Sequence, residues 1–324
     1  MKFSGPQNTE PKLVPAGRAI AAVTTELPCI TPYPIAATLA DLFDKSSASA
    51  AGYSAISGWL TCPEMARLKA LGVRRRPTAA EDAGIPRELS PIEIGIVVHA
   101  LRAIRLTHSD PITSVFGALK QWEPEMYPSD YDKLFIMMRT LDLNYPRDTD
   151  PLEYLGVEVE VISNVAPPGR PPILRSVRYD TVVRAGGQLF SFEAKTMSRS
   201  GYTALNAYNA QGMCQTAIWN SNEALVQQYG QMRGVIFDTF VKTETPKVER
   251  MEPRYYSQRQ QAIAAAYLAS PEASAFFARG EDGSYPRMLH SCWGRWRPCE
   301  YIDLCHDNVY GDYVIGDGTV YGGQ

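Results

Sequence analysis

The stretch from residue 178 to residue 196, RYDTVVRAGGQLFSFEAKT, decides the fold of this chain. It predicts two strands joined by Gly186 and Gly187, because two consecutive glycines suit the tight turn of a β-hairpin. With these two glycines as the loop, Ala185 faces Gln188. Strand alternation then gives the hairpin one face that we expect to lie against a core, formed by Thr181, Val183, Phe190 and Phe192.

The other face of the predicted hairpin carries charged side chains. Counting outward from the turn places Asp180 directly opposite Glu193, and Lys195 projects from the same face as Glu193. Like charges at opposed positions destabilise a sheet, but a divalent cation between them removes the repulsion, and carboxylate oxygens suit Mg²⁺ or Mn²⁺. An ammonium group beside such a cation can orient a water molecule or stabilise charge on a phosphate. Because exposed hairpins often carry Glu and Lys, the rest of the chain has to decide between a surface and a site.

The composition is that of an ordinary globular protein. With 324 residues, 45% hydrophobic and 21% charged, the chain can form one large domain or two small ones. The net charge of -3 gives no global sign of nucleic-acid binding, so any such binding requires a local basic surface. No apolar run is long enough to span a membrane and no signal pattern opens the chain, so we expect a cytoplasmic protein without a membrane partner.

A helix with a possible metal ligand precedes the hairpin. Residues 90–93, SPIE, form a capping box that opens a helix running to about Leu106. Glycine is costly inside a helix, so Gly95 indicates that another element packs close to it. His99 and Arg102 share the face of Gly95. A lone histidine on such a face is more often a core residue than a ligand.

The remaining pattern alternates helices and strands. It predicts helices over residues 35–45, 53–71, 108–150, 202–229 and 254–277, and strands starting at 156 and spanning 234–242. Residues 1–33 show little periodicity and indicate an irregular arm. On the helix of residues 202–229, Gln211, Gln215 and Trp219 recur at four-residue spacing and therefore share a face.

The cysteines gather near the C-terminus. Cys292, Cys299 and Cys305 fall within fourteen residues, which in a cytoplasmic chain indicates a metal ion or a cluster. Their spacing matches neither paired zinc knuckles nor ferredoxins. A cluster with four thiolates needs one more ligand from elsewhere, and Cys62 is the best candidate. His306 is a rival ligand, so zinc remains an alternative to iron and sulfur.

In this order, the motifs resemble the RecB-type branch of the PD-(D/E)xK nucleases. The resemblance covers residues from about 53 to 305 and points to the iron–sulfur members: CRISPR-associated exonucleases, the nuclease domain of the second AddAB subunit, and phage exonucleases. The family's glycine-x-x-x-histidine matches Gly95 and His99, its aspartate matches Asp180, and its Glu-x-Lys matches residues 193–195.

Two further family motifs are matched with a departure. The Q-x-x-x-Y motif falls on Gln215 with Trp219 in place of the tyrosine, and Gln211 is a rival for the glutamine. The family's split cluster, with one cysteine upstream and three near the C-terminus, matches Cys62, Cys292, Cys299 and Cys305.

The resemblance implies an α/β fold: a restriction-endonuclease-like mixed sheet flanked by helices. It implies that an N-terminal arm and short helix (1–52) precede a nuclease domain (53–305), and that a tail (306–324) follows. Within the nuclease domain it implies a helical insertion at about 108–150 and a cysteine region at about 285–305, where a [4Fe–4S] cluster joins the N- and C-terminal segments.

The resemblance also implies the chemistry. Mg²⁺ or Mn²⁺ would be held by His99, Asp180, Glu193 and the backbone carbonyl of Ala194. Lys195 would orient the attacking water, and Gln215 would place DNA or the lysine, which makes Asp180, Glu193, Lys195 and Gln215 the catalytic set. A DNA path near the cluster would use Arg74, Arg75, Arg76, Arg295, Trp296 and Arg297.

The implied function is metal-dependent exonuclease action on DNA, with single-stranded or frayed ends preferred. It would serve recombination, repair or the processing of phage and mobile-element DNA, with a recombination or single-strand-binding protein as a possible partner. Two alternatives stay open: a non-catalytic iron–sulfur scaffold in a recombination or integration complex, and a zinc-stabilised endonuclease of the same fold.

Overall fold

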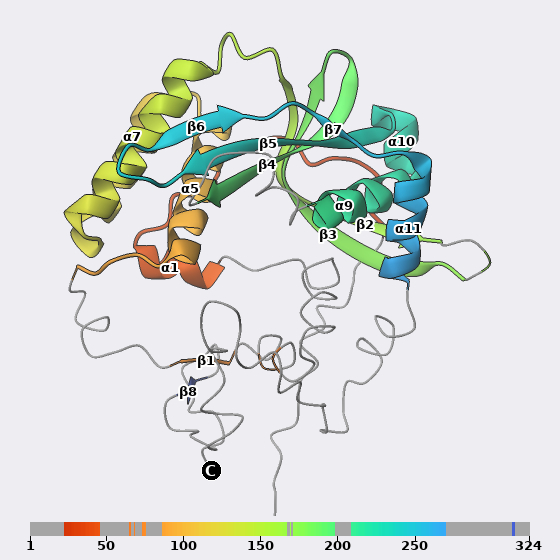
Figure 1. Ribbon diagram of the computed structural model, residues 1–324, viewed down its shortest axis with the longest axis horizontal. Helices are drawn as coiled ribbons and strands as arrows, with labels where there is room; N and C mark the ends of the chain where they lie inside the picture. Colours follow the sequence, from red (N-terminus) through yellow and green to blue (C-terminus); the bar gives the residue numbers. More distant parts are fainter. Residues whose placement is uncertain are drawn as a thin grey trace, which may run out of the picture. The chain divides into compact units, whose positions relative to one another are not determined.

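The computed structural model describes residues 23–45, 65, 68, 73–75, 86–166, 169, 171–197, 209–269 and 313–314. The chain divides into two units, one of residues 22–56 and 77–270 and the other of residues 1–21, 57–76 and 271–324. In the second unit, β1 (Arg74–Arg75) and β8 (Tyr313–Val314) pair as antiparallel strands. The first unit contains a six-stranded sheet and the helices that cover it (Figure 1).

The sheet is mixed and follows the order β2-β3-β4-β5-β6, with β7 also paired to β5. Its strands are β2 (Glu153–Val165), β3 (Ile173–Ala185), β4 (Gln188–Met197), β5 (Met232–Val241), β6 (Lys247–Arg250) and β7 (Arg254–Tyr255). Strand β4 runs parallel to β5, and the other neighbours are antiparallel. A mixed sheet flanked by helices confirms the α/β class predicted from the sequence.

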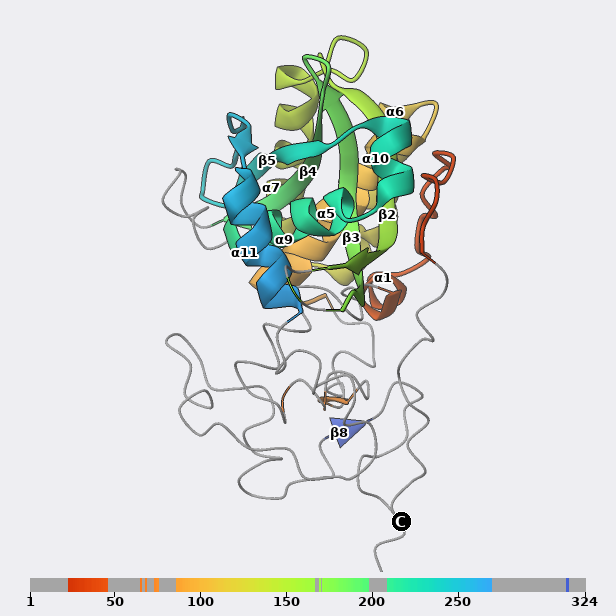
Figure 2. The same cartoon turned by 90° about the vertical axis from the view of Figure 1, so that its right-hand side faces the viewer.

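The helices form two groups, which Figure 1 shows on the left and on the right, and Figure 2 shows the same elements turned by 90°. One group consists of α1 (Leu39–Lys45), α5 (Pro91–Thr107), α6 (Pro111–Trp122), the 3-10 turn η1 (Glu123–Glu125) and α7 (Pro128–Asn144). The other consists of α9 (Asn209–Asn220), α10 (Glu223–Tyr229) and α11 (Gln258–Leu268). In the part of the chain that the structure describes, none of the helices combines the length and the apolar character needed to cross a bilayer.

Helix α5 begins as predicted. The Ser90 side chain accepts a hydrogen bond from the backbone of Glu93, and the Glu93 carboxylate accepts one from the backbone of Ser90. A Cβ atom at Gly95 would lie 3.2 Å from Oγ1 of Thr196, which confirms that another element packs against this glycine. The element is β4, so α5 approaches the strand that carries Glu193 and Lys195.

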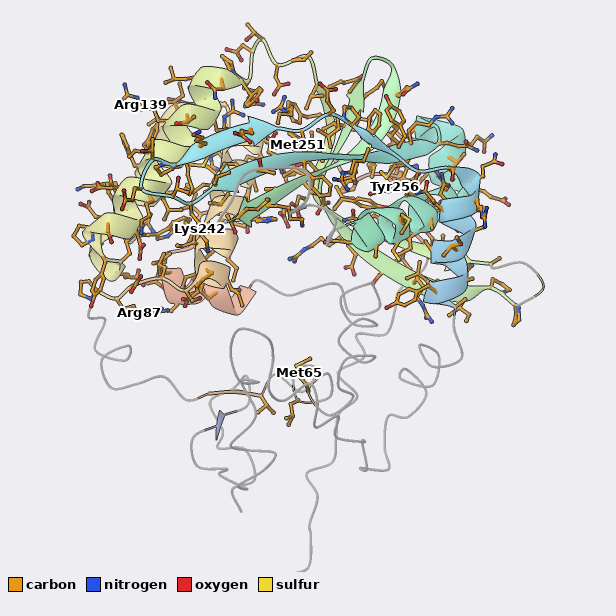
Figure 3. The ribbon with its side chains drawn as sticks, viewed as in Figure 1. Met65, Arg87, Arg139, Lys242, Met251 and Tyr256 are labelled. Atoms are coloured by element: carbon orange, nitrogen blue, oxygen red, sulfur yellow. The ribbon has the colours of Figure 1, made fainter. Side chains whose placement is uncertain are left out.

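A glycine also allows close packing in the second helix group. A side chain at Gly212 of α9 would overlap the hydroxyl of Tyr256 and crowd Val235 of β5. Tyr256 is labelled in Figure 3, where the side chains fill the space between the helices and the sheet. The glycine therefore allows α9 to pack directly against β5 and the residues that follow β7.

Several predicted boundaries are wrong, each for a local reason. The helix predicted over 202–229 is broken because Asn222 caps a new helix, accepting a hydrogen bond from Leu225. The helix predicted from residue 254 starts at Gln258, because Arg254 and Tyr255 pair with β5. Strand β6 was not predicted, and α1 starts at residue 39. Of the helices predicted over 53–71, only isolated positions are described, and residues beyond 269 lie outside the described range except for β8.

The hairpin turn is confirmed. Gly186 and Gly187 have φ of 54° and 77°, the left-handed values that glycine adopts without a steric penalty, and Ala185 pairs with Gln188. The predicted apolar face is buried, but so are Ser191 and Glu193 on the other face. Helices thus cover both faces of the hairpin, which excludes the exposed hairpin that the charged residues could also have indicated.

The hairpin ladder ends earlier than predicted. Strands β3 and β4 pair from the turn only as far as Val182 and Ser191, so Asp180 and Glu193 are not ladder partners, and that prediction is wrong. The reason is that β4 continues beside β5 as far as Met197 while β3 continues beside β2. Past Ser191 the two strands separate, and we call this opening, between residues 178–181 and 192–195, the β3–β4 fork.

Candidate metal centre

The β3–β4 fork and helix α5 bring His99 and Asp180 together. Nδ1 of His99 lies 3.2 Å from Oδ2 of Asp180, and the two side chains are 29% and 16% exposed. The same Oδ2 atom accepts a hydrogen bond of 2.9 Å from the backbone N–H of Ala194. Because β4 has left β3 at this point, the Ala194 N–H binds a side chain instead of a strand carbonyl. The fork therefore fixes the carboxylate beside the imidazole.

A third group, Glu158 of β2, joins this pair and was missed in the sequence. His99, Glu158 and Asp180 each offer a ligand atom, and these atoms lie within 4.8 Å of one another. The flanking ladder pairs, Val157 with Thr181 and Val159 with Tyr179, place Glu158 beside Asp180. Glu158 has φ of 52°, which is uncommon for any residue but glycine.

Burial and mutual repulsion perturb the carboxylates. Burial raises the pKa of Glu158 to about 7, and the negative charge of Asp180 adds to the effect. Burial and the charge of Asp180 likewise raise the pKa of Glu193. Burial alone would raise the pKa of Asp180, but His99 and then Lys195 outweigh it and hold that pKa well below its usual range. Among the described residues, carboxylates thus crowd this point of the sheet.

The pKa of His99 moves the other way. Burial lowers it, but the charge and the hydrogen bond of Asp180 outweigh burial and raise it above the ordinary value. A metal ligand has to be neutral at this nitrogen, so a cation and a proton compete for the same imidazole.

Glu193 and Lys195 of β4 form a second part of the site, together with glutamines of helix α9. Oε1 of Glu193 accepts a hydrogen bond of 2.9 Å from Nε2 of Gln215, and its Oε2 lies 3.3 Å from Nζ of Lys195. Gln211 is farther, with its Nε2 at 3.5 Å from Oε2. Gln215 is also buried, and its backbone carbonyl accepts a bond from the hydroxyl of Tyr179. Of the two rival glutamines, Gln215 has the firmer contact with Glu193.

The two parts approach the fork from different sides of β4. Phe192 is contacted by Arg102 of α5, whereas its neighbour Glu193 is contacted by Gln215 of α9. Successive residues of a strand point to opposite faces, so α5 and α9 flank β4 from opposite sides. This explains why His99 groups with Asp180 and Glu158 while Glu193 is held by the glutamine and the lysine.

Trp219, the residue in place of the motif tyrosine, is a core residue. It is fully buried, packs edge-on against Tyr179 with ring centroids 5.9 Å apart, and donates through Nε1 to the carbonyl of Gly230 at 3.0 Å. A side chain in this position stabilises the packing of α9 against the sheet and has no surface to offer to DNA.

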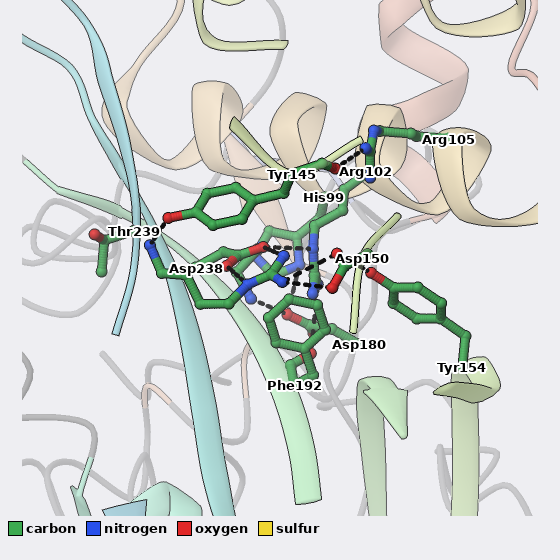
Figure 4. A network of polar contacts seen from close by, with 12 residues as sticks. His99, Arg102, Arg105, Tyr145, Asp150, Tyr154, Asp180, Phe192, Asp238 and Thr239 are labelled. Atoms are coloured by element: carbon green, nitrogen blue, oxygen red, sulfur yellow. Dashed lines mark hydrogen bonds and ion pairs between the residues drawn. The ribbon is translucent and has the colours of Figure 1, made fainter. Parts of the chain in front are cut away.

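A buried cluster of polar and charged side chains lies next to the metal centre, and Figure 4 shows it. We call it the Arg–Asp network, and its charged members are Arg102, Asp150, Asp238 and Arg250. Arg250 donates to Asp238 at 2.9 Å and to Asp150 at 2.8 Å, and Nε of Arg102 lies 3.8 Å from Asp238. The guanidinium groups of Arg102 and Arg250 lie 4.0 and 4.8 Å from the ring centre of Phe192. This network ties α5 to β4, β5 and β6 next to Glu193.

Several predicted site residues lie outside the described residues. They are Cys62, Cys292, Cys299, Cys305, Arg76, Arg295, Trp296 and Arg297. Arg74 and Arg75 are described as β1, paired with β8. Cys29 is exposed and Cys214 is buried, and both are free thiols. The iron–sulfur site and the basic DNA path therefore stay predictions from the sequence.

Comparison with known proteins gives little. No protein-family model and no curated protein matches the chain. Among solved structures, a protein from Eubacterium rectale named "Putative exonuclease" is 12% identical, with a TM-score of 0.41 over 84% of this chain and 93% of that chain. The protein SSO0001 is 14% identical, with a TM-score of 0.31 over 67% of this chain and 85% of that chain. Both TM-scores lie below 0.5, so a functional conclusion has to come from the geometry of the site.

Proposed function

We propose that this protein is a metal-dependent deoxyribonuclease that hydrolyses phosphodiester bonds. The observation that supports this most is the β3–β4 fork, where His99 and Asp180 meet beside a lysine that is held by Glu193. The motif resemblance gives the same reaction, and the structure brings its residues together from three separate segments of the chain.

The donor atoms fit a divalent cation. Neighbouring ligands of an octahedral cation with bonds of ~2.1 Å are ~3 Å apart, close to the distance of 3.2 Å between Nδ1 of His99 and Oδ2 of Asp180. The carboxylate and carbonyl oxygens suit Mn²⁺ or Mg²⁺, and the imidazole adds a nitrogen ligand of the kind that transition metals accept. The N–H and C=O of one strand residue point to the same side, so the Ala194 carbonyl lies on the fork side with its N–H. His99, Asp180, Glu193 and the Ala194 carbonyl are the proposed ligands.

The cation would supply Lewis acidity, lowering the pKa of the attacking water and stabilising charge on the phosphodiester. The protein's own residues would do the positioning. Lys195 would donate a hydrogen bond to the water or to a phosphate oxygen, and its contact with Glu193 fixes its direction. Gln215 would hold Glu193 in turn. Asp180, Glu193, Lys195 and Gln215 thus form the proposed catalytic set.

The substrate and the pathway are part of the proposal. The sequence contains no P-loop motif, so this chain has no motor of that kind to unwind a duplex, and we propose exonuclease action on single-stranded or frayed ends. The arginines near β1 and the Arg–Trp–Arg run at 295–297 would contact phosphates and bases. Recombination, repair or mobile-element processing is the proposed setting.

We also propose a [4Fe–4S] cluster on Cys62, Cys292, Cys299 and Cys305. The pairing of β1 with β8 supports it, because the segments that follow Cys62 and Cys305 in the sequence meet there. Anaerobically purified protein should be brown and contain about four irons per chain. Stoichiometric zinc in colourless protein would exclude the cluster. Serine substitutions at the four cysteines should lower the iron content, whereas Cys29→Ser should not.

The decisive test is a cleavage time course. Matched linear and circular single strands of one sequence are incubated with Mg²⁺ or Mn²⁺ and with the parent, Lys195→Ala or Lys247→Ala. Lys247 is an exposed lysine of β6 and serves as the control. We expect progressive loss of the linear strand only, abolished in Lys195→Ala and unchanged in Lys247→Ala. Equal loss of both strands would indicate an endonuclease, and equal activity of Lys195→Ala would place the active site elsewhere.

A further inference from the structure

The geometry points to Glu158 as a further ligand of the cation, provided by a strand that the Glu-x-Lys motif does not include. The inference deepens the proposed function and rests on it, since the cation is that of the nuclease site. It adds β2 to the elements that form the site and gives Asp180 a carboxylate partner other than Glu193.

The first argument is convergence. One nitrogen from α5, one oxygen from β2 and one oxygen from β3 lie within 4.8 Å of one another. In an octahedral site with bonds of ~2.1 Å, neighbouring ligands are ~3 Å apart and opposite ligands ~4.2 Å. A single cation can therefore reach all three groups after a small adjustment of the side chains.

The second argument is that the other contact of Glu158 is weak. Its Oε2 lies 3.5 Å from Nε of Arg178, whose side chain is 38% exposed. Long, solvent-exposed ion pairs stabilise proteins little. Against this, Glu158 stands beside Asp180, and like charges so placed in a ladder are unfavourable. A cation between the two carboxylates turns this repulsion into attraction.

The third argument is that the carboxylate oxygens of Glu193 already have other hydrogen-bond partners. Its oxygens contact Gln215 and Lys195, on the side of β4 that faces α9. Glu158 instead groups with His99, which is on α5. The two glutamates therefore serve different parts of the site: Glu158 binds the cation beside His99, and Glu193, besides its proposed bond to the cation, fixes Lys195.

The test measures Mn²⁺ affinity by titration calorimetry on the full chain, purified anaerobically and without DNA. Glu158→Gln should weaken binding about tenfold or more, the scale seen even for groups that only support metal ligands. Glu158→Asp keeps the charge but withdraws the oxygens, and aspartate tolerates positive φ better, so this variant should fold and still bind weakly. Both variants should retain the thermal stability of the parent without metal.

Two variants are controls. Glu160→Gln removes an exposed carboxylate of the same strand, and Arg178→Gln removes the ion-pair partner of Glu158. Neither should weaken Mn²⁺ binding more than about twofold, and the loss of the arginine should if anything strengthen it, since a positive charge near the cation is removed.

The outcomes separate this inference from the proposed function. Parent-like Mn²⁺ affinity in both Glu158 variants would overturn the inference, whatever the cleavage assay shows. So would an equal loss in Arg178→Gln, which would mean that the glutamate acts through its ion pair. A parent that binds Mn²⁺ through Glu158 but cuts no DNA would remove the nuclease and retain the metal site. A parent that binds no Mn²⁺ would overturn both.

Discussion

Helix α5 carries two polar clusters about one turn apart, and they differ in how their charge is balanced. In the Arg–Asp network, two arginines face two aspartates, and every side chain is at least 87% buried, the least buried being Arg250 at 13% exposure. In the metal centre, Asp180 has only His99 as a cationic neighbour in contact among the described residues, and Glu158 has a solvent-exposed arginine. The first cluster sets two arginines against two aspartates, whereas in the second the pKa of Glu158 and that of Glu193 are raised, so its negative charge is not fully balanced. Proximity of charged groups alone therefore does not identify a site. An excess of negative charge that no positive side chain balances does.

The largest expected effect comes from removing an aspartate from the Arg–Asp network, where positive and negative charges are equal in number. Asp238→Ala leaves Arg102 and Arg250 buried without their shared partner, and breaking such a pair costs about 3–5 kcal/mol of unfolding free energy. Urea unfolding followed by circular dichroism measures it. Glu153→Ala, which removes an exposed partner of Arg184, is the control and should cost under about 1 kcal/mol. Similar costs for both variants would remove the distinction between the two clusters.

The second prediction concerns variants of the metal centre, in which the cleavage rate should change far more than the unfolding free energy. Asp180→Asn and Lys195→Ala should each lower the cleavage rate by about 10²–10³-fold, as loss of one group that stabilises the transition state does. The unfolding free energy of metal-free Asp180→Asn should fall by less than that of Asp238→Ala, because the depressed pKa of Asp180 means that His99 and Lys195 stabilise its charge. If this variant were as unstable as Asp238→Ala, the metal centre would be a structural ion pair like its neighbour.

The third effect is stabilisation by metal. A cation that binds only the folded state at 100 times its Kd adds about 2.7 kcal/mol to the unfolding free energy. Thermal unfolding of the parent should therefore shift upward with Mn²⁺ and return with EDTA. The shift should disappear in Asp180→Asn and persist in Glu160→Gln, whose side chain is exposed on the same strand as Glu158. An undiminished shift in Asp180→Asn would place the cation elsewhere.

The smallest effect comes from a third charge pair on α5, which lies nearer to solvent. Burial alone would raise the pKa of Glu93, but hydrogen bonds from Arg87, labelled in Figure 3, and from Ser90 outweigh it and lower the pKa. A depressed pKa contributes stability above the unfolded value of about 4.3 and loses it as the pH falls through the folded value. Glu93→Gln keeps the capping box but should cost about 0.5–1 kcal/mol at pH 7 and nothing at pH 2–3. Equal cost at both pH values would mean that the charge is irrelevant.

Local signals predicted much of this fold. The capping box fixed the start of α5, the two glycines fixed the turn, and Gly95 indicated the close approach of another element. The meeting of His99 with Asp180 also agrees with the expectation that both belong to one site. The capping box and the turn depend on interactions between residues near in sequence, whereas Gly95 meets Thr196 from a distant strand.

What could not be predicted depends on strand register over long distances. The ladder past Ser191 opens because β4 pairs with β5, which follows some forty residues later. The position of Glu158 depends on a register shift near Gly156 and on a proline-rich loop between β2 and β3, and neither can be counted from the sequence. The burial of Trp219 results from its packing with Tyr179, a residue of another element.

The β3–β4 fork has a consequence for attempts to transplant this site. A peptide of residues 173–197 would keep the turn and the first four ladder pairs, but not the strand that draws β4 away. Without β5, nothing would stop the two strands from pairing on past Ser191, and the Ala194 N–H would then be engaged in the ladder instead of with Asp180. The smallest portable unit of the proposed site is therefore the four strands β2 to β5 with helices α5 and α9, and a designed miniature that omits β5 should lose the contact between Asp180 and the Ala194 N–H.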